Sequence, residues 1–337
     1  MLGSAVVSPG RPSPPIRLST GAHLTSVTYR PLAGSEEIEL FCRLSYVLDH
    51  ELPDDFANGC RRPEWTWVAL DGDRLLARLS WWTTPGGEVP LQFDFFDIDD
   101  TLPRADRDEV GLRLFEAAKA AVFPAGAKLP EYGRFVPPDW REDPAAREVV
   151  ESRTRVLEST GARLLVERLR LQWTPASLLP ESKGQLVFRP VADREDLLAL
   201  MTPVMEGTLD AHGQADLASG LTPREAAEQH YDEEFAGFKS PHEWWRIAEL
   251  PDGGGPVGFV VPARNNYHPI IAYIGVLPAH RGHGYIDEIL AEGTRILAAE
   301  GVDRIRASTD LGNVPMAKAF ARAGYVNFER ALNLVWD

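Results

Sequence analysis

Cysteine is scarce in this sequence, because Cys42 and Cys60 are the only two among 337 residues. Two cysteines provide neither a disulfide framework nor a metal-ligand set, and they predict two reduced thiols in a cytoplasmic protein. The sequence also lacks an apolar run of the roughly 20 residues that cross a bilayer. Its N-terminus lacks the basic and apolar segments of a signal peptide. We therefore predict a cytoplasmic location and no membrane partner.

The sequence also has fewer basic than acidic residues. The 35 Lys and Arg residues face 50 Asp and Glu residues, which gives a formal net charge of −15. This balance argues against a nucleic-acid or anionic-membrane partner. A hydrophobic content of 44% with 25% charged residues is typical of a globular protein. The length of 337 residues exceeds what one core usually fills, so it predicts two domains.

The first half begins with a flexible, proline-containing lead over residues 1–24. A predicted domain at 25–174 follows it. Alternating and helical periodicities, hairpin turns and capping residues define its elements. We predict strands at 26–32, 65–70, 75–83, 89–98, 129–136 and 164–173, and helices at 35–48, 105–122 and 144–160.

The second half repeats this order after a Pro- and Ser-containing linker at 175–185. Over the second domain, 186–337, we predict strands at 186–190, 244–250, 257–262, 270–277, 304–309 and 325–336, and helices after Asp193 and at 223–238, 285–300 and 315–323. Recurrence of one element order predicts two tandem copies of one α+β fold. Each copy is expected to be a mixed, mostly antiparallel twisted sheet flanked by helices.

One stretch, 271–296, carries the clearest chemical signal. It runs from an apolar strand through Pro278 into Arg281-Gly282-His283-Gly284 and then into a helix. Glycines let several backbone N–H groups point at one spot, and the helix N-terminus adds positive potential, so the loop suits a diphosphate. A tight turn without a ligand is the alternative for so short a motif. The sequence has no GxxxxGK[ST] loop and no repeated parallel βαβ units, which excludes two common nucleotide-binding designs.

Two motifs resemble those of a known family. Val276-Leu277-Pro278-x-x-Arg281-Gly282-x-Gly284 is similar to the acyl-CoA-binding motif of the GNAT N-acetyltransferase superfamily. Downstream, Asn313-x-x-Met316-x-x-x-Phe320-x-x-x-Gly324-Tyr325 resembles that family's helix-and-strand signature. The resemblance covers about 186–337 by motif and the first half by element order only, so a tandem GNAT protein is expected.

The resemblance implies a set of cofactor contacts. The amides of His283, Gly284, Tyr285 and Ile286 would hold the CoA pyrophosphate, in a loop shaped by the Arg281-Gly282 turn. The pantetheine arm would pair with the backbone of Ile274 and Val276, where the fourth and fifth strands splay apart. The Val276 N–H would polarise the thioester carbonyl. Asn313 and Phe320 would flank the thiol.

The sequence also departs from the family pattern. Ile286 replaces a small residue, Phe320 stands where many relatives have a Tyr that protonates the thiolate, and Ala272 stands where a Glu is frequent. Replacement acids and bases are predicted among Tyr273, Asp310, His230 and Glu234, with Tyr267 and His268 as further candidates. Deprotonation through water is an alternative, because positioning alone supplies much of the rate.

The first half lacks the glycine loop. Its corresponding strand, 89–98, is followed by Leu102-Pro103-Arg104 and a helix start with Asp106, Asp108 and Glu109. Carboxylates there suit the helix dipole but would repel a diphosphate. We predict a degenerate GNAT-like copy that packs against the second domain.

These observations predict an acyl-CoA-dependent N-acyltransferase that uses acetyl-CoA or another acyl-CoA as co-substrate and a small-molecule amine as acceptor. No metal is expected, because His280 and His283 have no third ligand. The acidic residues at 232–234 suggest a cationic acceptor, and the protein is expected to be a monomer or homodimer. The alternatives are a non-catalytic acyl-CoA-binding protein, or an acyltransferase of this fold with a carrier-protein or aminoacyl-tRNA donor.

Overall fold

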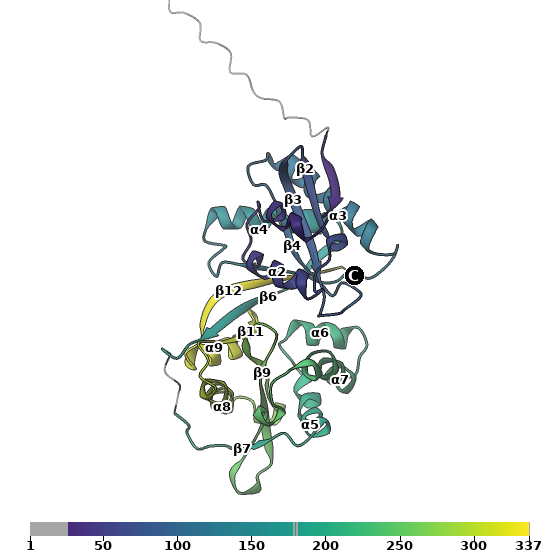
Figure 1. The fold of residues 1–337 in the computed structure, drawn as a ribbon. Helices are drawn as coiled ribbons and strands as arrows, with labels where there is room; N and C mark the ends of the chain where they lie inside the picture. The colour runs from purple at the N-terminus through teal and green to yellow at the C-terminus, as the bar shows by residue number, and fades with distance from the viewer. Residues whose placement is uncertain (1–25, 178, 180, 337) are drawn as a thin grey trace, which may run out of the picture.

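A computed structural model describes residues 26–177, 179 and 181–336 of the chain. The predicted lead at 1–24 lies outside the described residues. Figure 1 shows two stacked halves, with the N-terminal half above and the C-terminal half below. No helix within the described residues has both the length and the apolar character needed to cross a membrane.

Over the described residues, twelve strands form one sheet in the order β1-β2-β3-β4-β5-β12-β6-β11-β10-β9-β8-β7. Most neighbours are antiparallel, as predicted. The strands are β1 Thr28–Pro31, β2 Thr66–Asp71, β3 Arg74–Trp82, β4 Gln92–Ile98, β5 Tyr132–Val136, β6 Ala162–Trp173, β7 Val187–Pro190, β8 Arg246–Glu249, β9 Pro256–Arg264, β10 Pro269–Val276, β11 Ile305–Asp310 and β12 Val326–Trp336.

Helices cover both faces of the sheet. The α-helices are α1 Ile38–Phe41, α2 Leu52–Ala57, α3 Arg104–Val122, α4 Pro144–Ser159, α5 Arg194–Met205, α6 Ala211–Ala218, α7 Pro223–Glu234, α8 Tyr285–Ala299 and α9 Val314–Arg322. In the lower half, α8 and α9 lie on one side of the strands and α5, α6 and α7 on the other (Figure 1). Two separate clusters of buried apolar side chains pack these helices against the strands. One includes Val260, Ile289 and Phe320, and the other includes Leu197, Phe235 and Phe259.

The two halves exchange their last strands. β12, from the end of the chain, lies between β5 and β6, and β6 lies between β12 and β11. Each half therefore completes its sheet with a strand of the other half. The division at 25–174, 175–185 and 186–337 stays a prediction, and the pairing adds that residues of β6 reach the sheet of the second half.

The parallel pairs of the sheet are short. β10 and β11 have one registered pair, Ile270 with Arg306, and β4 and β5 have one, Phe93 with Tyr132. Beyond those pairs no further registered partners join the strands, so they diverge. The expected notch between the fourth and fifth strands of the second half is therefore present.

The helices differ from the sequence-based prediction in two respects. The helix predicted at 35–48 is wrong beyond Phe41, where α1 ends. The buried guanidinium of Arg78 donates to the Phe41 carbonyl at 2.9 Å, and Asp49 accepts the backbone N–H of Tyr46 at 2.9 Å, so these backbone groups bond outside a helix. Two short helices, α2 and α6, were not predicted. They lie where the sequence has no extended helical periodicity.

Candidate active site

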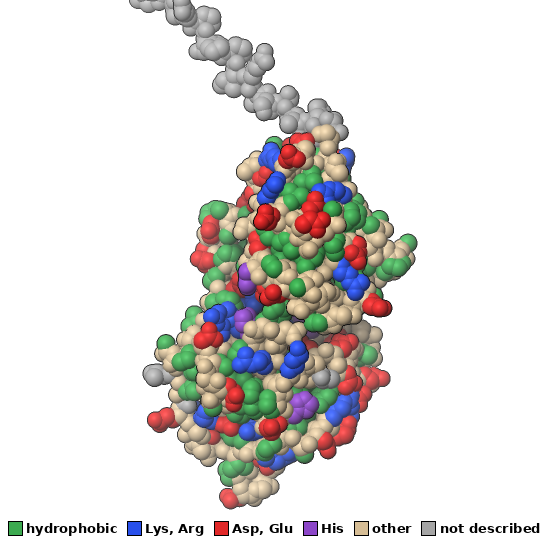
Figure 2. All heavy atoms as spheres, in the orientation of Figure 1, with side chains coloured by type: hydrophobic (Ala, Val, Ile, Leu, Met, Phe, Trp, Pro, Cys, Tyr) green, Lys and Arg blue, Asp and Glu red, His purple; other side chains and the backbone are tan. Residues whose placement is uncertain are grey.

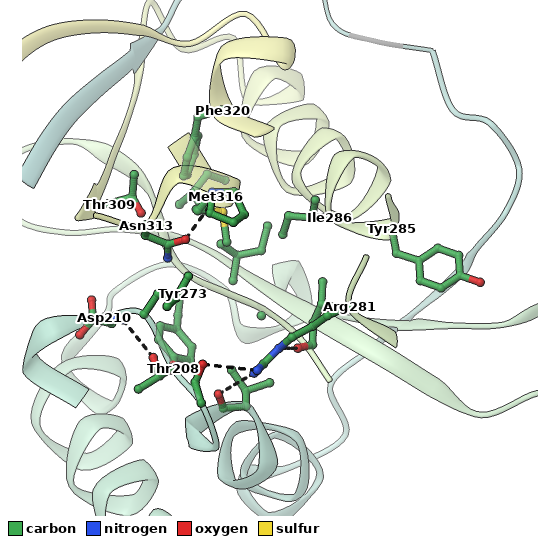
Figure 3. A pocket seen from close by; sticks show the side chains of 18 of the residues that line it. Thr208, Asp210, Tyr273, Arg281, Tyr285, Ile286, Thr309, Asn313, Met316 and Phe320 are labelled. Carbon is green, nitrogen blue, oxygen red and sulfur yellow. Dashed lines mark hydrogen bonds between the residues drawn. The ribbon is translucent and has the colours of Figure 1, made fainter. Parts of the chain in front are cut away.

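A cavity of about 410 Å³ lies in the second half, at the notch between β10 and β11 (Figure 3). Its floor is the backbone of β10, and its ends are the loop before α8 and the connection from α5 to α6. Its lining includes most of the residues predicted to bind the cofactor. These are Ile274, Val276, Arg281, Gly282, Gly284, Tyr285, Ile286, Asn313 and Phe320, whereas His283 is not among the lining residues.

The glycine loop has the backbone geometry that the sequence suggests. Gly282 and Gly284 have φ values of 86° and 79°, in the left-handed region that favours glycine. α8 begins directly after Gly284, which supplies no side-chain cap. The first N–H groups of a helix have no intrahelical acceptor, so those at the start of α8 are available to an anion.

Two carboxylates stand in the first turn of α8, and both are engaged elsewhere. Asp287 accepts from the Arg322 guanidinium at 2.5 Å. Glu288 is buried and accepts from the Ser182 hydroxyl at 2.7 Å and from the Gln185 backbone N–H at 3.2 Å. Asp287 is therefore paired with a cation, and Glu288 is hydrogen-bonded to the segment that precedes β7.

Arg281 connects the loop to α5. Its guanidinium donates to the carbonyl oxygens of Val204 and Glu206, each at 3.0 Å, and to that of Val276 at 3.2 Å (Figure 3). These are carbonyls at the end of α5 and the end of β10, and a cation at a helix C-terminus is favourable. Arg281 thus positions the loop relative to α5. Tyr285, in contrast, points its ring away from the cavity (Figure 3).

Alternate residues of β10 direct their backbone N–H and C=O groups toward the notch. The Leu277 N–H bonds to the Val257 carbonyl at 2.8 Å. Antiparallel pairing alternates, so Gly275 also faces β9, whereas Ile274 and Val276 direct their N–H and C=O groups to the opposite edge. That edge borders the notch. A register shift between Ile271 and Tyr273 places a bulge at Ala272.

A polar group closes the end of the cavity opposite the glycine loop. Asp210 lines the cavity and caps α6 by accepting the Gly213 N–H at 3.0 Å. Arg168 of β6, a residue of the first half, also lines it and lies 3.6 Å from Asp210. Arg168 Nε lies 3.1 Å from Asp310 Oδ1, and Asp310 accepts the Ala211 N–H at 2.6 Å. Two carboxylates therefore share one guanidinium.

The predicted acid–base residues are not equally placed. Tyr273 lines the cavity, and burial raises the pKa of its hydroxyl. Asp310 is buried beside the cavity rather than among its lining, and burial together with the charge of Asp210 raises the pKa of its carboxyl. His230 and Glu234 pair with each other at 3.4 Å on α7, outside the lining.

The other predicted acidic and aromatic candidates lie elsewhere. Tyr267 donates to Asp55 of the first half at 3.2 Å, and burial lowers the pKa of the neighbouring His268. Neither lines the cavity. Asp232 pairs with Arg194 at 2.8 Å on the exposed surface of α7. The acidic segment 232–234 is thus a solvated helix face and does not border the cavity.

Sequence reasoning missed several cavity residues, among them Arg168, Thr208 and Asp210. For Asp210 a signal exists, because an Asp three residues before Gly213 can cap a short helix. For Arg168 there is none, because its place in the cavity depends on the exchange of β6. The side of the cavity near α9 is apolar, with Met316 and Phe320, and the Asn313 side chain caps α9 through the Met316 N–H at 3.3 Å.

In the first half, side chains occupy the corresponding notch between β4 and β5. Arg134 donates to Asp97 at 2.9 Å and to the Phe96 carbonyl at 3.2 Å. The Tyr46 hydroxyl accepts the backbone N–H of Phe135 in β5 at 2.7 Å. This filling agrees with a degenerate copy. Among the described residues of both halves, no group of three or more His, Cys, Asp or Glu could hold a metal ion.

Comparisons with known proteins agree with this geometry. Residues 214–325 match the model of the Acetyltransferase (GNAT) family. A search of curated proteins finds no significant match. Within the C-terminal half, residues 214–325 are therefore similar to the GNAT acetyltransferase family.

Solved structures resemble the whole chain. A GCN5-related N-acetyltransferase from Sphaerobacter thermophilus matches with a TM-score of 0.56 and 16% identity, over 92% of this chain and 95% of that one. A glucosamine N-acetyltransferase region of a fungal multi-domain β-N-acetylglucosaminidase matches with a TM-score of 0.53 and 12% identity, over 94% of this chain and 38% of that one. Identities this low show the fold alone. The predicted α+β, GNAT-like fold is confirmed.

Proposed function

We propose that the protein is an acyl-CoA-dependent N-acyltransferase, with acetyl-CoA as donor, that acylates a small-molecule amine in a ternary complex. The observation that carries the proposal is the continuity of the cavity. It reaches from the Gly282-His283-Gly284 loop at the α8 N-terminus to the Asp210 carboxylate. An anion-binding end and an acidic end thus border one space, where a CoA thioester and an amine can meet.

Different residues along the cavity would bind different parts of the acyl-CoA molecule. The amides at the start of α8 would bind the diphosphate. The backbone groups of Ile274 and Val276 that face the notch would pair with the pantetheine arm, as an added strand pairs with a sheet edge, while the Val276 carbonyl also accepts from Arg281. The apolar wall with Met316 and Phe320 would exclude water from the thioester. His283 would contribute its backbone N–H only.

The chemistry requires proton transfer at both ends of the reaction. The amine nitrogen attacks the thioester carbon, its proton passes to a base, the C–S bond breaks, and the thiolate takes up a proton. We assign the base to Asp210, because it lines the cavity whereas Asp310 does not. Burial keeps the Tyr273 hydroxyl protonated, so Tyr273 suits the role of proton donor. The Val276 N–H would stabilise the oxyanion.

A second candidate function follows from the same site. Phe320 and Ala272 remove the acid and base that the family resemblance implies, so a non-catalytic acyl-CoA-binding protein is the alternative. A third candidate function is an acyltransferase of the same fold that uses a carrier-protein or aminoacyl-tRNA donor. The cytoplasmic location and the monomeric or homodimeric state also remain predictions.

Thiol release distinguishes these functions. The protein is incubated with acetyl-CoA and a panel of primary amines, free thiol is followed over time, and thermal unfolding is measured with and without CoA. Amine-dependent thiol release supports the transferase. Stabilisation by CoA without release with any amine supports the binding protein. No stabilisation by CoA, with consumption of a carrier-bound or tRNA-bound acyl group, supports the third.

A further inference from the structure

A row of polar side chains extends from the cavity along one face of the central sheet. Ser308 is exposed and lines the cavity, and it pairs across the sheet with Arg170 of β6. Arg306, two residues earlier on β11, pairs with Gln172. Side chains two residues apart share one face of a strand, so Arg168, Arg170, Ser308 and Arg306 lie on the same face. The cavity therefore leads onto a surface with two further arginines.

These two arginines converge on one place. The Arg306 guanidinium lies 3.7 Å from the Phe328 ring centroid, and that of Arg170 lies 5.3 Å from the same centroid. Arg170 also stacks on Phe135 at 3.5 Å. Stacking on an aromatic face leaves the in-plane N–H donors of a guanidinium unused. Arg306 is thus held through the face of its guanidinium, whereas Arg170 stacks and also pairs through its edge with Glu329.

The two guanidinium groups do not both have an anionic hydrogen-bond partner. Glu329 pairs with Arg170. The Nε and Nη1 atoms of Arg306 are buried and donate no hydrogen bond within the part of the chain that the structure describes. One positive charge is therefore left without a hydrogen-bonded anion, in a chain whose formal net charge is −15.

The surrounding groups do not supply the missing anion. Burial, followed by the charges of Arg170 and Arg304, lowers the pKa of Arg306, while the carboxylates of Glu329 and Asp303 act in the opposite direction. His268 faces the same arginines, and burial lowers its pKa, so it adds little charge near neutral pH. The acidic group nearest in sequence, Asp303, pairs with Arg304 at 2.9 Å and is 76% exposed.

We propose that the acceptor is an amine that carries a carboxylate, which binds Arg306 beside Arg170 while the amine lies at Asp210. The inference rests on the transferase function proposed above. A single uncompensated guanidinium matches one carboxylate, and its planar fork favours that group. Two to four residues of β11 span roughly 7–13 Å, which sets the separation of the amine and the acid. Arg306 is a specificity-determining residue in this arrangement.

Matched substrates test the proposal. Thiol release from acetyl-CoA is measured with 6-aminohexanoate and 8-aminooctanoate, each against the alkylamine of the same length. For at least one length, kcat/KM is expected to be at least about ten-fold higher for the amino acid. Arg306→Gln should bring this ratio close to one and leave the rate with the alkylamine unchanged. Arg304→Gln, which removes an exposed neighbouring charge, should keep the ratio. Equal rates for acid and amine in the wild type would overturn the inference.

Binding keeps the test independent of catalysis. Titration calorimetry measures the same four probes against the CoA-bound protein, and thermal unfolding verifies that each variant is folded. Carboxylate-dependent binding that Arg306→Gln removes supports the inference even if no thiol is released, in which case the transferase proposal alone fails. Binding without preference for the carboxylate overturns the inference even if thiol is released. If Arg306→Gln does not fold, Arg306→Lys should retain part of the preference, because it keeps the charge but loses the fork.

Discussion

Replacement of Gly284 by Asp and by Asn tests the position of the diphosphate site. Gly284 directly precedes α8 at a φ of 79°. Asn and Asp tolerate this left-handed conformation better than other side chains, and the two are nearly equal in size. A Cβ added at Gly284 meets no described heavy atom within 4 Å. The two variants therefore share the backbone strain and differ in a single negative charge.

The expected difference follows from Coulomb's law. A carboxylate about 5 Å from a phosphate charge is repelled by about 1 kcal/mol in bulk water and about 3 kcal/mol at an effective dielectric constant near 20. Since about 1.4 kcal/mol corresponds to ten-fold in affinity, the Asp variant should bind CoA roughly 5- to 150-fold more weakly than the Asn variant. The shared strain of about 1–2 kcal/mol should lower stability similarly in both.

Titration calorimetry with CoA at low salt provides the measurement, and thermal unfolding without ligand verifies that both variants fold. The difference in Kd should shrink at 1 M salt, where the Debye length falls to about 3 Å. Equal CoA affinities of the Asp and Asn variants at low salt would refute the assignment of the diphosphate to this loop.

Three further predictions concern the acidic end of the cavity, the contact between the halves and the packing of α8. Asp210→Asn keeps the helix cap but should lower kcat by about 100-fold or more with unchanged CoA affinity, as thiol release and calorimetry can show. The hydrogen bond that the His212 imidazole donates to the Glu131 carboxylate raises the pKa of His212 above its usual value. Its stabilising effect is full below about pH 6.5 and is lost as pH rises through the raised pKa, so urea unfolding should show the largest deficit of His212→Gln at low pH. Gly293→Ala places a Cβ 2.6 Å from Val260, and urea unfolding should show a loss of about 1–3 kcal/mol.

The exchange of strands gives the first half a place in the candidate site. β6 delivers Arg168 to the cavity and Arg170 to the adjoining surface, although neither belongs to the half that carries the glycine loop. On the face shown in Figure 2, Lys, Arg and His side chains gather around the waist between the halves. The first half, whose own notch is filled, therefore contributes a side chain to the cavity of the second half.

The geometry of the glycine loop was predictable from sequence because its parts are contiguous. An apolar strand, Pro278, two glycines and a helix follow one another within a few turns, so local backbone preferences determine their geometry. The same holds for the hairpins and for most helix limits. It fails at 35–48, where the side chain of Arg78, distant in sequence, takes the Phe41 carbonyl.

The acceptor end could not be predicted in this way, because it depends on pairing between distant segments. Alternation shows that β6 and β12 are strands, but a strand's period does not identify its neighbours. Only the three-dimensional structure decides that β6 pairs with β11, which brings Arg168 to Asp310 and Asp210. The sequence alone therefore determined the fold class and the position of the glycine loop. The tertiary structure decided which half supplies the charged groups at the Asp210 end of the cavity, because strand register is a long-range choice.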